Sequence, residues 1–589
     1  MNRPFRLHLF RQGPDSAPAP AIRSAAMTPK KLQTMRTLPA IFALAALSVT
    51  TFATNKASAE IIPSDDPMLK AMQLELDREK AQLLLPGMQR PYFIEYHLDD
   101  IDTYEALANY GALTLEQANH QRIVRVSVRV GDYANDSSSA RGDGVVQLAP
   151  KDDNPLALRY ALWTATDEAY KGALRSYAAK QAALKRFQAP PSEKDFAPAK
   201  AVTHIDPLAT MDLDRAVWRK RVVEASGIYA NDPEVRSFAD QVQYSTANIR
   251  AVVLNRYLVN TEGTVVRQGS SSYNAAISVG GQAPDGMRLG RDNGSVATSA
   301  KDLESPAAFH KRVVDDLKSF NALRNAPVVA ADDYHGPVLF SGDAAADTFN
   351  RLFVPNVEAD RPEMGTAART QGAYSSSLHA AVLPETFNVT DNPGLKTFAG
   401  QPLLGAYAID DEGVPAQAVN LVVNGKLQNY LLGRGPIKDF PDSNGHGRGA
   451  AGQPAHSHSG VMLIKSSAPL TAAALNAKLL GLAKDQGHDV YAVDTLGGEL
   501  APRLLYRVHA DGSRDLVRGA SFDELDVRTL RSDIQAAGDD ATAYVANAPG
   551  PIPQTTIAPA ILFGDIGVKR ANEEQQKLPY YAPPALETK

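Results

Sequence analysis

The amino-acid sequence predicts an α+β protein, in which mixed helices and antiparallel strands precede a large β-rich C-terminal domain. Three observations indicate this class. The long helical patterns lie before residue 330, alternating apolar and polar residues mark strands among them, and turn dipeptides separate short apolar runs after them. With 589 residues, of which 44% are hydrophobic and 22% charged, the chain has a globular composition and enough length for two or three domains.

Residues 1–59 are predicted to be absent from the mature protein. The segment before Met27 resembles sequence upstream of the true start, and basic residues then precede an apolar run from about Leu38 to Phe52. Ala57 and Ala59 supply the small residues of a signal-peptide cleavage site. The apolar run is shorter than the ~20 residues that a spanning helix needs. We therefore expect export to the periplasm or beyond, without a permanent membrane anchor.

Residues 60–200 are predicted to form an N-terminal α+β domain that ends in a linker. Asp66 and Pro67 begin a helix that stops at Pro86-Gly87, and a second helix runs from Pro155 to about Phe187. The proline-rich segment 188–200 indicates the linker. Between the helices, alternation predicts a half-exposed antiparallel strand, with Val124, Val126, Val128 and Val130 against Arg125, Ser127 and Arg129.

Two further domains and a tail are predicted after the linker. Residues 201–332 form a middle α+β domain, with helices near 211–225 and 307–323 and a hairpin turn at Glu262-Gly263. Residues 333–571 form the β-rich C-terminal domain, in which Asn424-Gly425 and Asp511-Gly512 supply hairpin turns that accept positive φ. Residues 572–589 are polar and proline-rich, which predicts disorder.

Composition excludes several classes of function. The chain contains no cysteine, which excludes disulfides, thiolate zinc sites, iron–sulfur clusters and a cysteine nucleophile. A net charge of -5 without a clustered basic face argues against nucleic-acid binding. The sequence has no Walker-type phosphate loop, no G-x-S-x-G elbow after a strand and no H-E-x-x-H zinc helix.

The stretch NGHGRGAAGQPAHSHSG, residues 444–460, places three histidines in one glycine-rich loop. In an extended segment His456 and His458 lie on the same side, and with His446 they could form a three-nitrogen metal site. No carboxylate stands inside the loop to orient the rings, so solvated histidines are the alternative interpretation.

The stretch AIDDEG, residues 408–413, bunches three acids and allows two interpretations. Asp410, Asp411 and Glu412 could form an acid/base pair or a cation site, or a charged turn that Gly413 closes. We favour the turn, because adjacent side chains on a strand point to opposite faces.

Motifs in the C-terminal half together resemble the TldD/PmbA family, in which PmbA is also called TldE. They are GPVLFSGDAAADTF, AIDDEGVP, VNGKLQNYLL, NGHGR and GASFDELDVRTLRSDI, in this order. The similarity is strong from about Tyr334 to Lys569 and weaker, but in consistent order, before it. The chain resembles an exported branch rather than the cytoplasmic members.

The resemblance implies a metallopeptidase family. Its active members bind zinc through His-Glu-x-x-x-His on a helix and through a C-terminal cysteine, with the glutamate as general base. It also implies a TldD–TldE heterodimer that encloses a chamber, cleaves unfolded peptides and holds them as an added strand. Only the TldD-type chain carries the metal.

This sequence departs from the active pattern at both places. After GPVLF it reads Ser341 to Asp347 without histidine or glutamate, and AYVANAPGPIPQTTIAP replaces the cysteine segment. We therefore expect a non-catalytic TldE-like subunit that binds no zinc of its own. Asp343 and Asp347 share a helix face and could hold a hard cation, although a solvated helix start near the helix dipole is the favoured interpretation.

The resemblance places NGHGR on the enclosed cavity, so Asn444, His446 and Arg448 are the candidate substrate-binding residues. His446, His456 and His458 remain weak metal candidates. The expected partner is a TldD-like zinc-bearing homologue or a second copy of the chain, with unfolded peptides as substrates. Two alternatives stay open: an active metallopeptidase with a substitute histidine site, and a non-enzymatic peptide-binding scaffold outside the cytoplasm.

Overall fold

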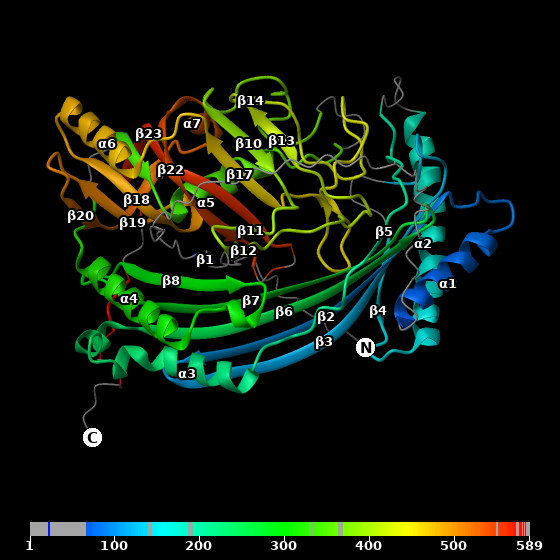
Figure 1. Ribbon diagram of the computed structural model, residues 1–589, viewed down its shortest axis with the longest axis horizontal. Coiled ribbons are helices and arrows are strands. Elements are labelled where there is room, and N and C mark those ends of the chain that lie inside the picture. The colour runs from blue at the N-terminus through cyan, green and yellow to red at the C-terminus, as the bar shows by residue number, and fades with distance from the viewer. Residues whose placement is uncertain are drawn as a thin grey trace, which may run out of the picture.

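The computed structural model describes residues 22–23, 66–138, 144–185, 193–330, 334–362, 369–548, 550, 552–572, 576–579, 581 and 584. A long curved sheet from the first half of the chain carries the second half on its concave face, as Figure 1 shows. Mixed helices and strands, with a sheet-rich C-terminal region, confirm the predicted α+β class. The predicted cleavage residues Ala57 and Ala59 lie outside the described residues.

The curved sheet has seven strands in the order β4-β3-β2-β6-β7-β5, with β8 also paired to β7. All neighbours are antiparallel except β5 and β7. The strands are β2 (Phe93–Asn109), β3 (Ala112–Arg129), β4 (Val145–Ala149), β5 (Thr203–Ile205), β6 (Tyr244–Asn260), β7 (Val265–Gln282) and β8 (Arg288–Ala297).

Four helices cover one face of this sheet. Even-numbered residues of β2 point toward them: Tyr96 and Leu98 pack with α1 and α2, and Ala106 packs with α3 and α4. Each helix begins at a side chain that accepts a backbone N–H bond, from Asp66, Asn154, Asp214 or Ser305. The helices are α1 (Pro67–Gln82), α2 (Pro155–Leu184), α3 (Arg215–Asn231) and α4 (Pro306–Asn325), with 3₁₀ turns at Arg236–Gln241 and Ala300–Asp302.

The boundary predicted at residue 200 does not separate two sheets. Strand β2 of the predicted N-terminal domain pairs with β6 of the predicted middle domain along its whole length, from Glu95–Asn260 to Asn109–Thr246. The described part of the predicted linker, residues 193–200, packs on the sheet, since Phe196 is buried and lies edge-on to Phe93 at a centroid distance of 5.1 Å. Residues 66–330 therefore share one sheet.

Eleven strands of the C-terminal half, together with β1, form a twelve-stranded sheet around β23, which pairs with β9, β17, β21 and β22. The two predicted hairpin dipeptides lie at turns, with positive φ at Asn424, Gly425 and Gly512. The strands and helices are β9 (Tyr334–Phe340), α5 (Asp343–Leu352), β10 (Phe387–Asp391), β11 (Thr397–Phe398), β12 (Gln401–Pro402), β13 (Val419–Val423), β14 (Lys426–Leu427), β15 (Gly447–Arg448), β16 (His456–Ser457), β17 (Val461–Ser466), α6 (Ala472–Gln486), β18 (Val490–Leu496), β19 (Pro502–Val508), β20 (Arg514–Val517), β21 (Ala520–Asp523), α7 (Val527–Ser532), β22 (Ile534–Ala546) and β23 (Gln554–Arg570), with 3₁₀ turns at Val354–Asn356 and Gly498–Leu500.

Both ends of the chain contribute small contacts. Strand β1 (Ile22–Arg23), inside the segment predicted to be removed, pairs antiparallel with β22. Within the predicted tail, the N–H of Gln576 donates to the carbonyl oxygen of Gly286 at 3.2 Å. This part of the tail therefore contacts the turn between β7 and β8 instead of being free.

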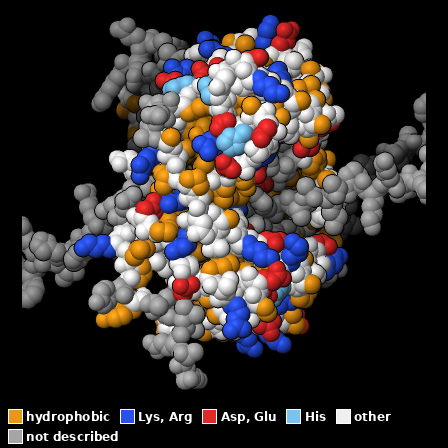
Figure 2. All heavy atoms as spheres, turned by 90° about the vertical axis from the view of Figure 1, so that its left-hand side faces the viewer, with side chains coloured by type: hydrophobic (Ala, Val, Ile, Leu, Met, Phe, Trp, Pro, Cys, Tyr) orange, Lys and Arg blue, Asp and Glu red, His pale blue; other side chains and the backbone are white. Residues whose placement is uncertain are grey.

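The surface seen in Figure 2, which is the left-hand side of Figure 1, intersperses basic side chains with acidic ones. This mixture agrees with the low net charge of the chain. Among the described helices, none is both long enough and apolar enough to cross a bilayer.

Candidate functional site

The glycine-rich loop of residues 444–460 reaches from the C-terminal domain to the concave face of the curved sheet. Its two short strands pair, with Gly447 opposite Ser457 and Arg448 opposite His456. Between them the backbone passes close to the sheet at Gly452, whose φ is +71° and whose added Cβ would lie 3.0 Å from Cγ2 of Ile123. Glycine is therefore required by both the positive φ and the close approach.

A chain of buried charges joins this loop to the sheet. Arg256 on β6 donates from Nε to Oδ1 of Asp99 at 2.7 Å and pairs through Nη1 with Asp411. Asp411 also accepts from Nε of Arg448 at 3.1 Å, and Asp99 accepts from the N–H of Gly452 at 3.0 Å. Burial by itself would raise the pKa of Asp411, but the two guanidinium groups outweigh burial and hold it well below the usual range.

The structure buries His446 fully and leaves Asn444 partly exposed. Nε2 of His446 lies 3.2 Å from Oδ1 of Asp391, while its Nδ1 lies 3.0 Å from Oδ1 of Asn444. The Asn444 side chain accepts from the N–H of Leu432 at 2.8 Å and donates to the carbonyl oxygen of Tyr430 at 2.8 Å. These side chains hold the loop in place, and their polar groups are engaged inside the protein.

Arg448 is partly exposed, as Asn444 is. Its guanidinium stacks on the ring of Tyr407 at 4.0 Å while it bonds to Asp411. The side chain is 16% exposed. Arg448 therefore anchors the loop through Asp411 and keeps part of its surface accessible.

The three loop histidines do not converge. His456 is half-exposed and pairs with Asp360 at 3.0 Å, whereas His458 lies 3.5 Å from Glu358. His446 pairs with a third carboxylate, Asp391. Within the described ranges, no group of three or more histidine, aspartate or glutamate side chains is arranged to hold a metal ion.

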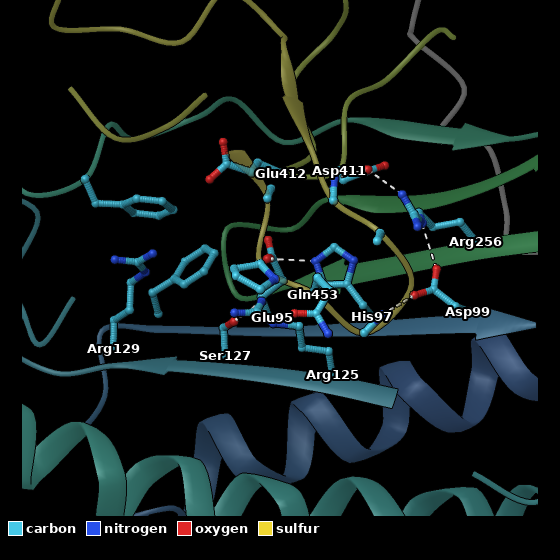
Figure 3. A pocket seen from close by; sticks show the side chains of 17 residues that line it. Glu95, His97, Asp99, Arg125, Ser127, Arg129, Arg256, Asp411, Glu412 and Gln453 are labelled. Carbon is cyan, nitrogen blue, oxygen red and sulfur yellow. Dashed lines mark hydrogen bonds and ion pairs between the residues drawn. The ribbon is translucent and has the colours of Figure 1, made fainter. Parts of the chain in front are cut away.

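A cavity of about 70 Å³ lies between the residues that follow β15 and the strands β2, β3 and β6 (Figure 3). It has room for several water molecules or one small polar group. Most of the lining side chains are charged or polar. They are Glu95, His97, Asp99, Arg125, Ser127, Arg129, Arg256, Asp411, Glu412 and Gln453, with Phe93 and Phe196 at one side.

Glu95 and His97 form the centre of the sheet side of the cavity. Nε2 of His97 lies 2.9 Å from Oε1 of Glu95, and both residues are buried. Burial raises the pKa of Glu95, but the charges of His97, Arg434 and Arg125 outweigh it and hold the pKa below its usual value. The second oxygen, Oε2, is buried without a hydrogen-bond partner in the described part of the chain. It is therefore an acceptor available to water or a bound donor.

The acids of residues 410–412 form a turn, as favoured, but not a solvated one. Gly413 has φ of +78°, and Asp410 and Asp411 are buried. Asp410 accepts from the N–H groups of Val414 and Gly447, at 2.8 and 2.9 Å. Burial, and secondly the charge of Glu412, raise the pKa of Asp410 well above its usual range. Glu412, whose pKa burial also raises, lines the cavity.

Helix α5 occupies the position at which the resemblance implies a zinc motif. Ser341 Oγ donates to Asp494, and Asp343 and Asp347 are buried rather than solvated, which corrects the expectation of an exposed helix start. Both oxygens of Asp347 are held by Arg351, at 2.8 and 2.9 Å. Zinc requires several histidine, cysteine or free carboxylate donors. The residues at α5 do not fit a zinc ion.

Sequence reasoning missed the sheet side of this site. The predicted half-exposed strand has Arg125 and Ser127 buried, at 8% and 5% exposure, because the C-terminal domain covers that face. One sequence feature could have indicated it: arginines alternate with valines along β3, so that one face of this strand carries several charged side chains. Glu95 and His97 alternate in the same way on β2.

Comparison with known proteins agrees with this architecture. Residues 333–570 match the family model described as the PmbA/TldA metallopeptidase C-terminal domain. No curated protein matches the sequence.

Three solved structures share the fold over 85% of this chain. A protein described as a modulator of a DNA gyrase from Thermotoga maritima is 14% identical, has a TM-score of 0.56 and is covered over 99% of its length. TldE from Thermococcus kodakarensis is 13% identical, with a TM-score of 0.55 and 99% coverage. A protein described as a modulator of DNA gyrase from Bacteroides thetaiotaomicron is 12% identical, with a TM-score of 0.55 and 98% coverage.

Proposed function

We propose that this chain, whose residues 333–570 match the PmbA/TldA metallopeptidase C-terminal domain, serves peptide proteolysis as a non-catalytic, TldE-like subunit. One observation carries the proposal. At α5, the position of the family's zinc motif, Asp347 is buried and both its oxygens bind Arg351. A carboxylate whose two oxygens are both engaged by a guanidinium is not free to act as a zinc ligand.

The role left to this chain is to hold peptide. Strand β4 is the terminal strand of the curved sheet in the described part of the chain, so one edge of its backbone is not used by β3. Val146 and Leu148 on β4 are 49% and 77% exposed, and they stand on the same face as Arg125 and Ile123 beside the cavity. A peptide added to β4 as a strand would pack apolar side chains on Val146 and Leu148.

The cavity supplies polar contacts beside that edge. Glu95 Oε2 is a buried acceptor, and Glu412 and Gln453 line the opposite wall. Charged walls with one unpaired acceptor suit a donor group, such as a peptide N–H or the amide of a side chain. Under this proposal Arg448 positions the wall through Asp411, while Asn444 and His446 maintain the loop.

The catalytic centre would come from a TldD-like homologue that completes the chamber. In the absence of such a homologue, a second copy of this chain would complete the chamber. Export is part of the proposal: residues 1–59 carry the signal peptide, so the chain and its partner work in the periplasm or beyond. Both elements rest on the sequence, through the family resemblance and the apolar run before Ala57.

The proposal is tested by metal content and peptide cleavage of the purified mature chain, alone and together with the homologue that carries the zinc motif. Alone, the chain should hold no stoichiometric zinc and cleave no unstructured peptide, and activity should appear with the homologue. Zinc-dependent cleavage by the isolated chain would contradict the proposal. If a His456→Ala, His458→Ala double variant then lost that cleavage, the loop would be the metal site. His446 is left unchanged because it is fully buried.

Peptide binding is tested separately by a charge at the β4 edge. Leu148→Glu should weaken the binding of an unstructured fluorescent peptide by about tenfold, because the acid must be desolvated when the peptide packs on it. Leu74→Glu on α1 is the matched control, since Leu74 is 58% exposed and lies on the helix-covered side of the sheet. Equal binding by both variants would exclude β4 as the peptide site.

A further inference from the structure

Helix α2 presents an apolar stripe to solvent in its first three turns. Leu156, Tyr160 and Trp163 are 62%, 61% and 46% exposed, and their spacing of four and three residues puts them on one face. The rings of Tyr160 and Trp163 meet edge-on at 6.2 Å. The only other tryptophan of the chain, Trp218, is buried. Large exposed aromatic groups in one stripe are typical of protein interfaces.

The same stripe continues along the helix with different chemistry. Asp167 and Lys171 form an ion pair at 2.6 Å, with both side chains close to half-exposed. About one, two and three turns further on, Arg175, Ala178 and Ala182 are exposed. The stripe therefore carries large apolar groups at one end, an acid and a base in the middle, and a guanidinium and small residues at the other end.

Two copies of this stripe are complementary when their helices run antiparallel, because each group on one helix then faces its counterpart from the other end of the second helix. We propose that α2 packs antiparallel against α2 of a second copy of this chain, with a two-fold axis at the level of Ala169. Asp167 then faces Lys171 of the other copy, and Trp163 faces Arg175. Tyr160 and Leu156 pack over Ala178 and Ala182, so that large side chains meet small ones. Each contact occurs twice, as an isologous interface requires.

Physical complementarity selects a second copy as the occupant. The acid and base lie two residues either side of the axis, so the paired helices join opposite charges in both copies. Trp163 over Arg175 adds a cation–π contact, which tryptophan and arginine form best among natural side chains. The 30-residue helix is about 45 Å long, enough for a continuous helix–helix seam. Figure 1 shows α2 at the end of the curved sheet, beyond the C-terminal domain.

This surface is separate from the cavity and from β4, so it does not rest on the proposed function. Val146 and Leu148 face the C-terminal domain, whereas α2 packs on the opposite face of the sheet. The paired stripe therefore uses no residue of β4 or α5. A dimer of this kind would present two such sites.

The test uses Asp167→Lys and Lys171→Asp as two separate variants of the mature chain, measured by analytical ultracentrifugation at micromolar concentration. The unchanged chain should dimerise. Each variant alone should dimerise at least about tenfold more weakly, because like charges face each other twice at the axis. An equimolar mixture of the two should restore dimers, because one copy then carries two bases at these positions and faces two acids on the other copy. Restoration in the mixture cannot arise from a folding defect in either variant.

Asp315→Lys on α4 is the matched control, since Asp315 forms the same type of exposed pair with Lys311, at 2.6 Å. It should leave dimerisation unchanged. Trp163 fluorescence should also become less accessible to acrylamide as the concentration rises. A monomeric unchanged chain at tens of micromolar would overturn the proposal, as would a dimer that neither charge variant weakens or a mixture that does not recover.

Discussion

Glu358 is the residue whose environment most clearly predicts a pH effect. Burial raises the pKa of Glu358 to about 8, and the nearby carboxylates Asp391 and Asp360 also raise it. The hydrogen bond that Glu358 accepts from the N–H of Ser459 lowers the pKa but does not outweigh these effects. Burial lowers the pKa of His458, 3.5 Å away, so that ring gives the carboxylate little positive charge near neutral pH.

The raised pKa means that the folded state binds a proton that the unfolded state has released above about pH 4.5. Its contribution to stability is therefore full below that pH and is lost as the pH rises to about 8. Relative to Glu358→Gln, the unchanged protein should lose on the order of 2 kcal/mol between pH 5 and pH 8. Thermal unfolding of both proteins across this range measures the difference. The exposed Glu385→Gln should keep the unchanged slope, and parallel pH profiles for all three would refute the prediction.

Arg256 links the sheet to the C-terminal domain through Asp99 and Asp411. Arg256→Met leaves buried Asp99 without its guanidinium partner and Asp411 with Arg448 alone, so we expect a loss of about 3–5 kcal/mol in the free energy of unfolding. Arg250→Met, on an exposed position of the same strand β6, should change it by less than about 0.5 kcal/mol. Denaturant unfolding of the two variants tests this prediction. Equal unfolding midpoints would show that the charge network adds nothing to the stability of the fold.

At the scale of elements, two costs of placing a side chain in the glycine-rich loop can be measured separately: the strain of the left-handed backbone and the steric clash with the sheet. Gly452 and Gly487 both have φ of +71°, but only at Gly452 would a Cβ meet other atoms, at 3.0 Å from Ile123 and 3.2 Å from Val146. Gly487→Ala should cost about 1 kcal/mol, for the left-handed backbone alone. Gly452→Ala should cost about 1 kcal/mol more, since overpacking adds to the strain. Equal losses in chemical denaturation would mean that the loop does not press on the sheet.

At the scale of the whole molecule, two sheets enclose a layer of paired charges. The mature chain that forms these sheets is predicted to begin after residues 1–59, which carry the signal peptide, have been removed. N-terminal sequencing of protein from the native host should start at or near Glu60, because Ala57 and Ala59 present small residues to the processing enzyme. Replacing Ala57 and Ala59 by arginine should block removal and retain Lys30 and Lys31. A mature protein that keeps those lysines without any substitution would refute export.

The sequence by itself determined where most local elements lie. Helices α1 and α2 begin at Pro67 and Pro155 as predicted, and α4 begins at Pro306, one residue before its predicted start, whereas α3 spans Arg215–Asn231 and not about 211–225. The start of α1 was predictable because a cap such as Asp66 acts within one turn of its own helix. The turn at Asn424-Gly425 was equally local, since positive φ favours these residue types. The ordered motifs of the C-terminal half also predicted the family model that residues 333–570 match.

Tertiary structure alone decided which polar residues became the site. Arg125 and Ser127 alternate with valines whether their face meets water or protein, so the pattern could not reveal that the C-terminal domain buries them. The pairing of β2 with β6 joined two predicted domains, and Asp99, Arg256 and Asp411 came together from three distant segments. Nothing local encodes such contacts, because their free energy arises only when the sheet and the glycine-rich loop exclude water between them.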